Sequence, residues 1–126
     1  MQVCVDTSVV IDWLRQPDSE KTILYQLIAN QYEISISVVA VTELYSGKSV
    51  WQHAQAKTRL NGVLAECRVL PLESDAAILA GELRVKHEVA LLDALIAATA
   101  IQHNQSLATL NTKDFSQISN LSLWSK

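Results

Sequence analysis

Four acidic side chains occur inside or beside apolar segments, where a carboxylate is seldom placed without a partner. Asp6 ends the apolar run QVCV, Glu43 lies within VVAVTELY, Asp93 begins DALIAATAI and Asp114 follows LATLNTK. An isolated ionised carboxylate in such surroundings is destabilising, so it needs a hydrogen-bond cap, a cation or a metal ion. Few basic residues lie near these positions in the sequence. A divalent ion shared by the four acids is the simplest explanation, and it predicts a metal-dependent hydrolase, with a nuclease as the first candidate.

Three of these acids also have a purely structural interpretation. Asp6 and Asp93 can cap the helices that their segments predict, and Asp114 can be a turn residue. Glu43 has no such alternative, because it lies at neither end of a largely apolar helical segment. Taken one at a time the acids are ambiguous, and only their convergence at one place would distinguish a site from a set of caps.

The ligand types indicate which ion would bind. Carboxylate oxygens are hard donors that suit Mg²⁺ or Mn²⁺, and no His or Cys accompanies the four acids, which disfavours zinc. Such an ion would activate a water molecule and stabilise the charge of a phosphate during hydrolysis. The sequence leaves open whether one or two ions bind. The cation would also screen a phosphate from the four carboxylates, which explains how an acidic protein can cleave a polyanion.

Composition bounds the class of protein. The chain has 126 residues, of which 49% are hydrophobic and 18% charged, as expected for one globular domain spanning residues 1–126. No segment reaches the roughly 18 to 20 apolar residues that span a bilayer, and the first residues lack the pattern of a signal peptide. We therefore expect no membrane association and a cytoplasmic location.

The charge balance limits how the protein can bind a nucleic acid. The formal net charge is -3 and the isoelectric point is near 5.5, which excludes a broadly basic surface. Contacts to phosphates must then be local. The candidates for such contacts are Lys48, Lys57, Arg59 and Lys113.

Hydrophobic periodicity predicts strands and helices in alternation, with no repeat or linker between them. This order favours a mostly parallel sheet with helices on both faces, a three-layer α/β/α fold. The expected strands are 2–5, 33–37, 67–71, 107–110 and a possible last one at 121–124, and the expected helices are 7–15, 19–30, 38–46, 48–65, 74–87 and 93–103, with a turn or helical stub at 111–118.

This topology brings the acids together. In an open parallel sheet, sites form beyond the carboxyl ends of the strands, which is where the first strand places Asp6. Asp114 follows the strand at 107–110 by a few residues and can reach the same edge. Asp93 lies at the amino end of a buried helix, and Glu43 lies on the helix that directly follows the second strand. Four residues far apart in the sequence are therefore expected to meet in one cleft.

Four segments then carry a family resemblance that spans the whole chain: VDTSVVIDWLR, ISISVVAVTELYSG, LLDALIAATAIQHN and LATLNTKDF. They resemble, in this order, the motifs of PIN-domain ribonucleases, and in particular the VapC-like toxins of bacterial toxin–antitoxin pairs. The resemblance implies a PIN fold and a divalent-metal-dependent endoribonuclease that uses Mg²⁺ or Mn²⁺. It also implies the site residues: Asp6, Glu43, Asp93 and Asp114 as the catalytic, metal-binding acids, with polar contacts from Thr7, Ser8 and Asn111.

The resemblance further implies partners: an RNA substrate, a cognate antitoxin and a second copy of the chain in a homodimer. The helix with Trp51 and the stripe of Leu60 and Leu64 are candidate surfaces for the antitoxin. Two alternatives remain open at this point. One is a non-catalytic binding module with the same fold. The other is an aspartate-based phosphotransfer domain, which would need a second Asp two residues after Asp6, where Ser8 stands.

Overall fold

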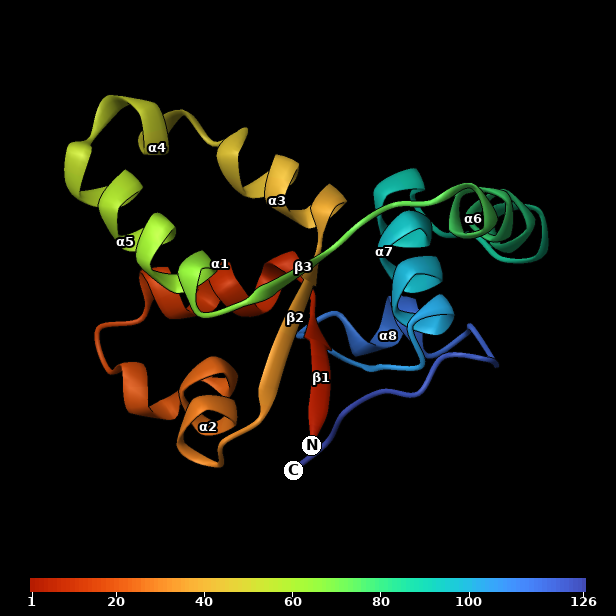
Figure 1. Cartoon of the computed structure of the whole chain (residues 1–126), viewed down its shortest axis with the longest axis horizontal. Coiled ribbons are helices and arrows are strands. Elements are labelled where there is room, and N and C mark those ends of the chain that lie inside the picture. The colour runs from red at the N-terminus through yellow and green to blue at the C-terminus, as the bar shows by residue number, and fades with distance from the viewer.

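A parallel four-stranded sheet forms the centre of the protein, whose computed structural model describes all residues, 1–126 (Figure 1). The strands lie side by side in the order β3-β2-β1-β4. Val5 pairs with Ile36 on one side and with Ala108 on the other, so β4 ends level with β1 and β2 continues for one more residue. The predicted α/β class with a mostly parallel sheet is confirmed. The bounds are β1 (Gln2–Val5), β2 (Glu33–Ser37), β3 (Arg68–Leu70) and β4 (Ser106–Ala108).

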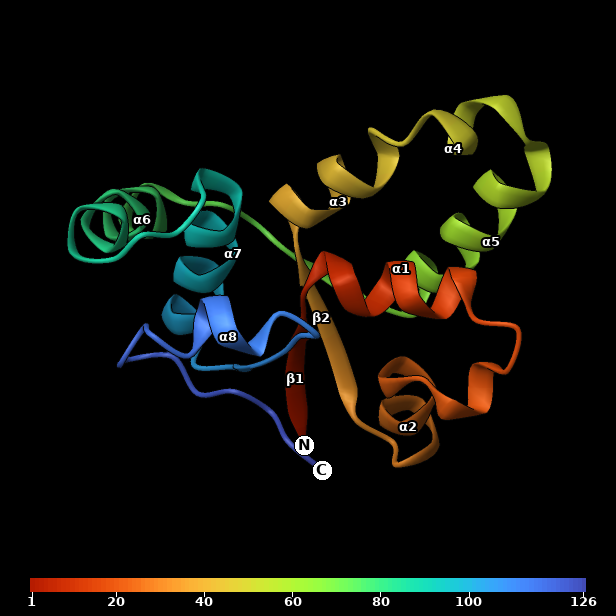
Figure 2. The same ribbon diagram turned by 180° about the vertical axis from the view of Figure 1, so that it is seen from behind.

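Helices cover both faces of this sheet and produce three layers. In Figure 1 the layer containing α1, α2 and α5 lies to the left of the strands, and α6, α7 and α8 lie to the right. Figure 2, from behind, shows α3 above the carboxyl ends of the strands, between the two layers. The bounds are α1 (Thr7–Arg15), α2 (Ile23–Ala29), α3 (Val38–Tyr45), α4 (Lys48–Gln52), α5 (Ala54–Ala65), α6 (Ser74–Lys86), α7 (Leu91–Gln102) and α8 (Thr112–Phe115), with a short 3₁₀ helix η1 (Ser19–Lys21).

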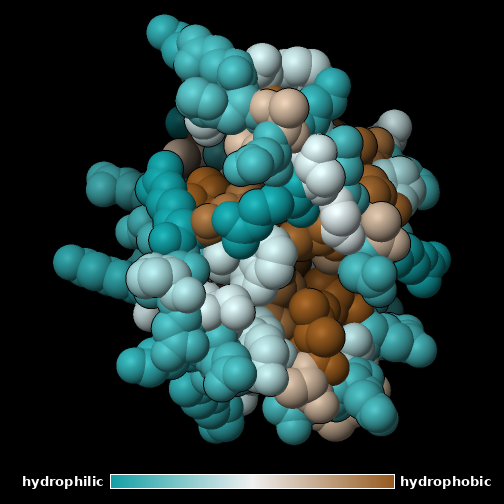
Figure 3. All heavy atoms as spheres, turned by 90° about the vertical axis from the view of Figure 1, so that its left-hand side faces the viewer, coloured by the Kyte–Doolittle hydropathy of each residue, from teal (hydrophilic) through white to brown (hydrophobic).

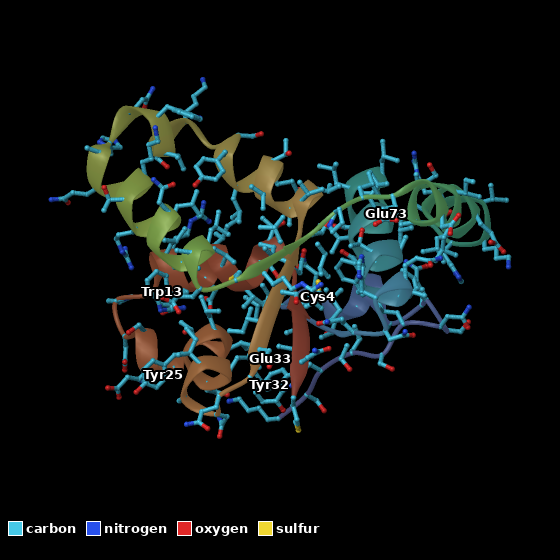
Figure 4. The ribbon with its side chains drawn as sticks, in the orientation of Figure 1. Cys4, Trp13, Tyr25, Tyr32, Glu33 and Glu73 are labelled. Atoms are coloured by element: carbon cyan, nitrogen blue, oxygen red, sulfur yellow. The ribbon has the colours of Figure 1, made fainter.

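Burial explains why these segments fold as they do. The middle of β1 is fully buried on both faces, with Val3, Cys4 and Val5 at 0% exposure, as is typical of a parallel strand covered by helices. Figure 4 shows Cys4 near the centre of the sheet. Helix α7 buries most of its residues from Ala94 to Ala100, so its apolar sequence leaves almost no polar face. Its small side chains allow it to pack closely against both α6 and the sheet.

The predicted helix over 48–65 is wrong in one respect, because the chain breaks at His53 into α4 and α5. His53 has an extended backbone (φ -125°, ψ 115°) and is both the C-cap of α4 and the N-cap of α5. The break lets α4 bury Val50 while α5 turns back toward the sheet and buries Leu60 and Val63. Leu60 is 0% exposed, so the expectation that it serves a partner surface is also wrong, whereas Trp51 remains 63% exposed.

Two further boundaries differ from the expectation. The segment 19–30 begins with the 3₁₀ turn η1, because Thr22 donates to the carbonyl of Ser19 (2.7 Å) and caps α2 by accepting from Tyr25 N (3.2 Å). The segment 121–124 is not a strand and forms only one bridge, between Leu107 and Leu123. Backbone bonds on either side of that bridge tie the end of the chain to β4 without continuing the ladder. No helix is long and apolar enough to cross a bilayer.

Candidate active site

Asp6 is the centre of a hydrogen-bond network at the carboxyl end of β1. Its side chain is 2% exposed and accepts three hydrogen bonds: from Thr7 N (2.8 Å), Ser8 Oγ (2.9 Å) and Thr109 Oγ1 (2.7 Å). Asp6 is the N-cap of α1, so the capping interpretation of this residue is correct as far as it goes. The capping bond from Thr7 N uses Oδ1 of Asp6, and the hydroxyl groups of Ser8 and Thr109 both donate to Oδ2. These donors replace the water that the buried carboxylate has lost.

Thr109 is a site residue that the sequence analysis missed. The register pairs Val5 with Ala108, so the residues that follow them, Asp6 and Thr109, lie side by side just beyond the ends of adjacent strands. The N–H of Asp6 donates to the carbonyl of Ala108 (2.9 Å), which holds this register at the strand ends. Thr109 is 5% exposed, and its hydroxyl oxygen also accepts from Asn111 N (2.9 Å). The sequence analysis placed Thr109 inside the expected strand 107–110, whereas β4 ends at Ala108 and leaves Thr109 at the carboxyl end of the strand.

Glu43 reaches the same edge from the other side. Helix α3 begins immediately after β2, where the Ser37 hydroxyl caps it by accepting from Val39 N (3.1 Å). The helix therefore rises from the carboxyl edge of the sheet and carries Glu43 above the start of α1. There Thr7 Oγ1 donates to Glu43 Oε1 (2.7 Å). Thr7 thus connects two acids, because its backbone N–H binds Asp6 and its hydroxyl binds Glu43.

Asp93 and Asp114 complete the group of acids through their charges. Asp93 lies in the first turn of α7, but the N-cap is Ala90, so the capping interpretation of Asp93 is wrong. The pKa of Asp93 is raised from its ordinary 3.8 to about 6, first by partial burial and then by the charges of Asp6, Glu43 and Asp114 in that order. Asp114 is exposed on α8. The structure thus brings all four predicted acids within electrostatic range of one another.

The predicted supporting residues differ in their contacts. The Ser8 hydroxyl donates to Asp6 and accepts from Leu110 N (3.0 Å), so it joins α1 to the loop after β4. Asn111 is exposed and precedes α8 without a side-chain capping bond. It contributes its backbone N–H to Thr109, and a role for its side-chain amide stays a prediction.

The donor set is chemically suited to a hard divalent cation, since all four acids offer oxygen and no competing cationic side chain pairs with them. The four carboxylates are nevertheless too far apart to form a closed ion site in this arrangement. No three acidic, His or Cys side chains surround a common point at ligand geometry. Both Asp6 oxygens are engaged with protein donors, and like charges repel one another across the group. A cation that neutralised the repulsion would favour a closer arrangement of the same side chains.

The PIN domain family model matches residues 3–121 of this chain. The chain belongs to the PIN-domain family. This PIN domain is 32% identical to Ribonuclease VapC2 of Rickettsia felis over 97% of each chain. Among solved structures it is similar to VapBC2 from Rickettsia felis bound to a promoter DNA fragment, with a TM-score of 0.81, 28% identity and coverage of 99% of this chain and 100% of that one.

A second solved structure, a toxin–antitoxin complex from Klebsiella pneumoniae, has a TM-score of 0.75 and 29% identity, with 94% of each chain covered. These similarities confirm the family resemblance and the three-layer α/β/α fold that the sequence predicted. Membership of the PIN-domain family also sets aside the phosphotransfer alternative. Ser8 stands where that alternative required a second Asp, and it binds Asp6.

Proposed function

We propose that this protein is a divalent-metal-dependent endoribonuclease and the toxin of a toxin–antitoxin pair. The observation that carries the proposal is the gathering of four acids from four distant segments at one sheet edge, where partial burial first, and then the charges of the other three acids, raise the pKa of Asp93 to about 6. A carboxylate with a raised pKa, lying among other acids at the carboxyl ends of parallel strands, is typical of a functional site. The ribonuclease activity named for the Rickettsia felis relative supplies the reaction class.

We assign Asp6, Glu43, Asp93 and Asp114 as the residues that would hold Mg²⁺ or Mn²⁺. A bound ion of this kind lowers the pKa of its water and offsets the charge of the phosphate under attack. The surrounding side chains position the acids. Thr7 orients both Asp6 and Glu43, and Thr109 and Ser8 hold one Asp6 oxygen. The Asn111 amide, exposed at the rim, is proposed to contact the substrate.

We further propose that the protein acts on RNA in the cytoplasm, as one domain of residues 1–126, and is inhibited by a protein antitoxin. The similar Klebsiella pneumoniae structure is a toxin–antitoxin complex. A cavity of about 290 Å³ between α1, α2 and α5 offers an apolar surface, lined among others by Trp13, Ile28 and Val63. Figure 3 faces this side and shows apolar side chains in a hollow among polar ones, and Figure 4 places Trp13 where α1 and α5 approach α2. Exposed apolar surface of this kind is typical of a protein interface.

A homodimer is the remaining partner proposal. Helix α6 exposes Ile78 (72%) and Val85 (88%), seven residues apart and therefore on one side of the helix. Sedimentation equilibrium of the purified protein tests the proposal. Dimers that dissociate when Val85→Glu is introduced would support it, and monomeric wild-type protein at micromolar concentration would contradict it.

The enzymatic proposal is tested by incubating purified protein with a labelled pool of transfer, ribosomal and messenger RNA and with Mg²⁺ or Mn²⁺. Wild-type protein is expected to produce discrete cuts that disappear with a chelator. Asp6→Asn keeps the size of the buried side chain and is expected to remove cleavage while the protein stays folded. Asp12→Asn, on the same helix but outside the network, is the matched control and is expected to cleave normally.

Two results would contradict the proposal. Metal-dependent cleavage by Asp6→Asn at the wild-type rate would remove Asp6 from the site. No cleavage of any RNA by wild-type protein that binds the metal ion would favour a DNA substrate or the non-catalytic binding module.

A further inference from the structure

The segment between Glu43 and Glu66 has a charge pattern unlike the rest of this acidic chain. Residues 44–65 contain no Asp or Glu, although the whole chain carries 13 of them. The same segment contains Lys48, Lys57 and Arg59. These three basic residues lie on α4 and α5, and we call residues 48–65 the basic arm. A chain with a net charge of -3 therefore concentrates positive charge on one projecting part of the fold (Figure 1).

A cavity connects this basic arm to the candidate active site. It has a volume of about 250 Å³ and lies between α1, α3, α4 and α5. Glu43 forms part of its wall, so the cavity begins where the group of acids ends. The other polar side chains that line it are Arg15 at the end of α1, Arg59 on α5 and Ser49 on α4. Two guanidinium groups and a hydroxyl group therefore lie beside the acidic edge.

Neither guanidinium group of the cavity has an acidic partner within the chain. The two ion pairs of the protein, Lys21–Asp18 and Lys86–Glu82, both lie elsewhere. Arg59 is held in place, because its Nη1 donates to the Leu14 carbonyl (3.0 Å) and its guanidinium lies 4.9 Å from the centre of the Trp13 ring. A guanidinium has five N–H donors, so most of those of Arg59 remain free. Lys57 is engaged differently, since its ammonium lies 4.7 Å from the Trp51 ring centre.

We propose that this cavity is a phosphate subsite, in which Arg15 and Arg59 bind the backbone of the RNA strand next to the bond that is cleaved. The inference rests on the proposed ribonuclease function. A positioned, unpaired guanidinium matches a phosphate in geometry and charge. The subsite also resolves the problem that four acids pose for a polyanionic substrate, because it attracts the strand beside the place where the acids repel it. A strand seated here would pass directly from the arginines to Glu43.

The test measures the salt dependence of binding, which counts phosphate contacts independently of how much protein is folded. A short fluorescein-labelled single-stranded RNA is titrated by anisotropy with full-length Asp6→Asn protein, which binds without cutting, at several KCl concentrations. Arg15→Gln and Arg59→Gln are each expected to reduce the slope of log Kd against log salt by about 0.7, and the double variant by about twice that amount. Arg59→Lys, which keeps the charge, is expected to retain the slope of the Asp6→Asn protein that carries both arginines.

The matched control is Arg68→Gln, which removes an exposed arginine on β3 that lies outside this cavity. It is expected to leave the slope unchanged. A double variant with the same slope as Arg68→Gln would overturn the subsite. Tighter binding of a labelled polyglutamate peptide than of RNA would also overturn it, and would indicate an acidic protein segment as the occupant.

The outcome separates this proposal from the proposed function. Metal-dependent RNA cleavage by wild-type protein, together with unchanged slopes in the arginine variants, would keep the enzyme and overturn the subsite. Reduced slopes together with no cleavage would support the subsite on a protein that binds RNA without cutting it.

Discussion

Replacing Asp93 with Asn is expected to stabilise the protein while removing its activity. The pKa of Asp93 is raised from 3.8 to about 6 in the folded state, so folding disfavours the ionised carboxylate. A difference of this size corresponds to at most about 3 kcal/mol. Asp93 is only partly buried and solvent screens its neighbours, so we reduce the expected penalty to about 1 kcal/mol. Asn has similar size and no charge, and it avoids this penalty.

The sign of the pH dependence follows from the two pKa values. Well below pH 3.8 the carboxyl group is protonated in both states and contributes no difference. As the pH rises from about 4 to about 6, the unfolded chain loses its proton first, so the wild-type protein loses stability across this window. Above about pH 6 the full penalty is present. The advantage of Asp93→Asn should therefore be largest at pH 7.5 and fall to roughly a third at pH 4.5.

Urea unfolding followed by circular dichroism, with a chelator present, measures this difference at both pH values. At pH 7.5 the gain of about 1 kcal/mol corresponds to roughly 4 °C in Tm for a chain of this length. Asp75→Asn is the matched control, because Asp75 also lies in the first turn of a helix, α6, but away from the acids. It reports the loss of the favourable helix-dipole interaction alone and is expected to be neutral or destabilising.

Three results would refute this reasoning: no stabilisation by Asp93→Asn at pH 7.5, an equal gain at both pH values, or an equal gain from Asp75→Asn. The combination of higher stability and lost cleavage would identify Asp93 as a residue retained for function at a cost in stability.

The remaining predictions concern the cation, the network and the thiols. Mg²⁺ or Mn²⁺ at 100 times its Kd should raise the unfolding free energy of the wild-type protein by about 2.7 kcal/mol in urea titrations, and an equal rise in Asp93→Asn would contradict the assignment. Thr109→Val should lower the free energy of unfolding by roughly 1.5 to 3 kcal/mol in chemical unfolding, because Asp6 loses a donor. Thr99→Val is the comparison, because the Thr99 hydroxyl donates to a neutral carbonyl, and it should lower the free energy of unfolding by about 1 kcal/mol. Equal losses in the two variants would refute the role of Thr109. Burial raises the pKa of Cys4 to about 12 and that of Cys67 to about 11. Iodoacetamide at pH 8 should therefore modify the thiols of the folded protein on the order of a hundredfold more slowly than a free thiol. Fast labelling seen by mass spectrometry would contradict this burial.

The main elements and the convergence of the acids were predictable because they depend on short-range patterns and general topology. The strand 2–5 and the helix 7–15 follow from local periodicity, and the structure reproduces their bounds. The rule that sites form at the carboxyl ends of parallel strands then placed Asp6 and Glu43 at one edge. The PIN resemblance, which rests on segments along the whole chain, was confirmed as well.

Other features could not be read from the sequence, because they depend on distances between segments that are remote in the chain. Thr109 becomes a partner of Asp6 only through the register of β1 and β4. The break at His53 depends on where α4 and α5 must pack, and no Pro or Gly marks it. The expected strand at 121–124 is reduced to a single bridge, in which Leu123 pairs with Leu107 of β4.

The chemistry of the site divides in the same way. The residue types alone determined that a cluster of carboxylates would suit a hard cation, because the donor atom is a property of the side chain. Only the tertiary structure decided that Asp93 has a raised pKa, that Thr7 links Asp6 to Glu43, and that two unpaired arginines line a cavity beside them. Burial, charge coupling and hydrogen bonding depend on separation in space, and folding sets that separation.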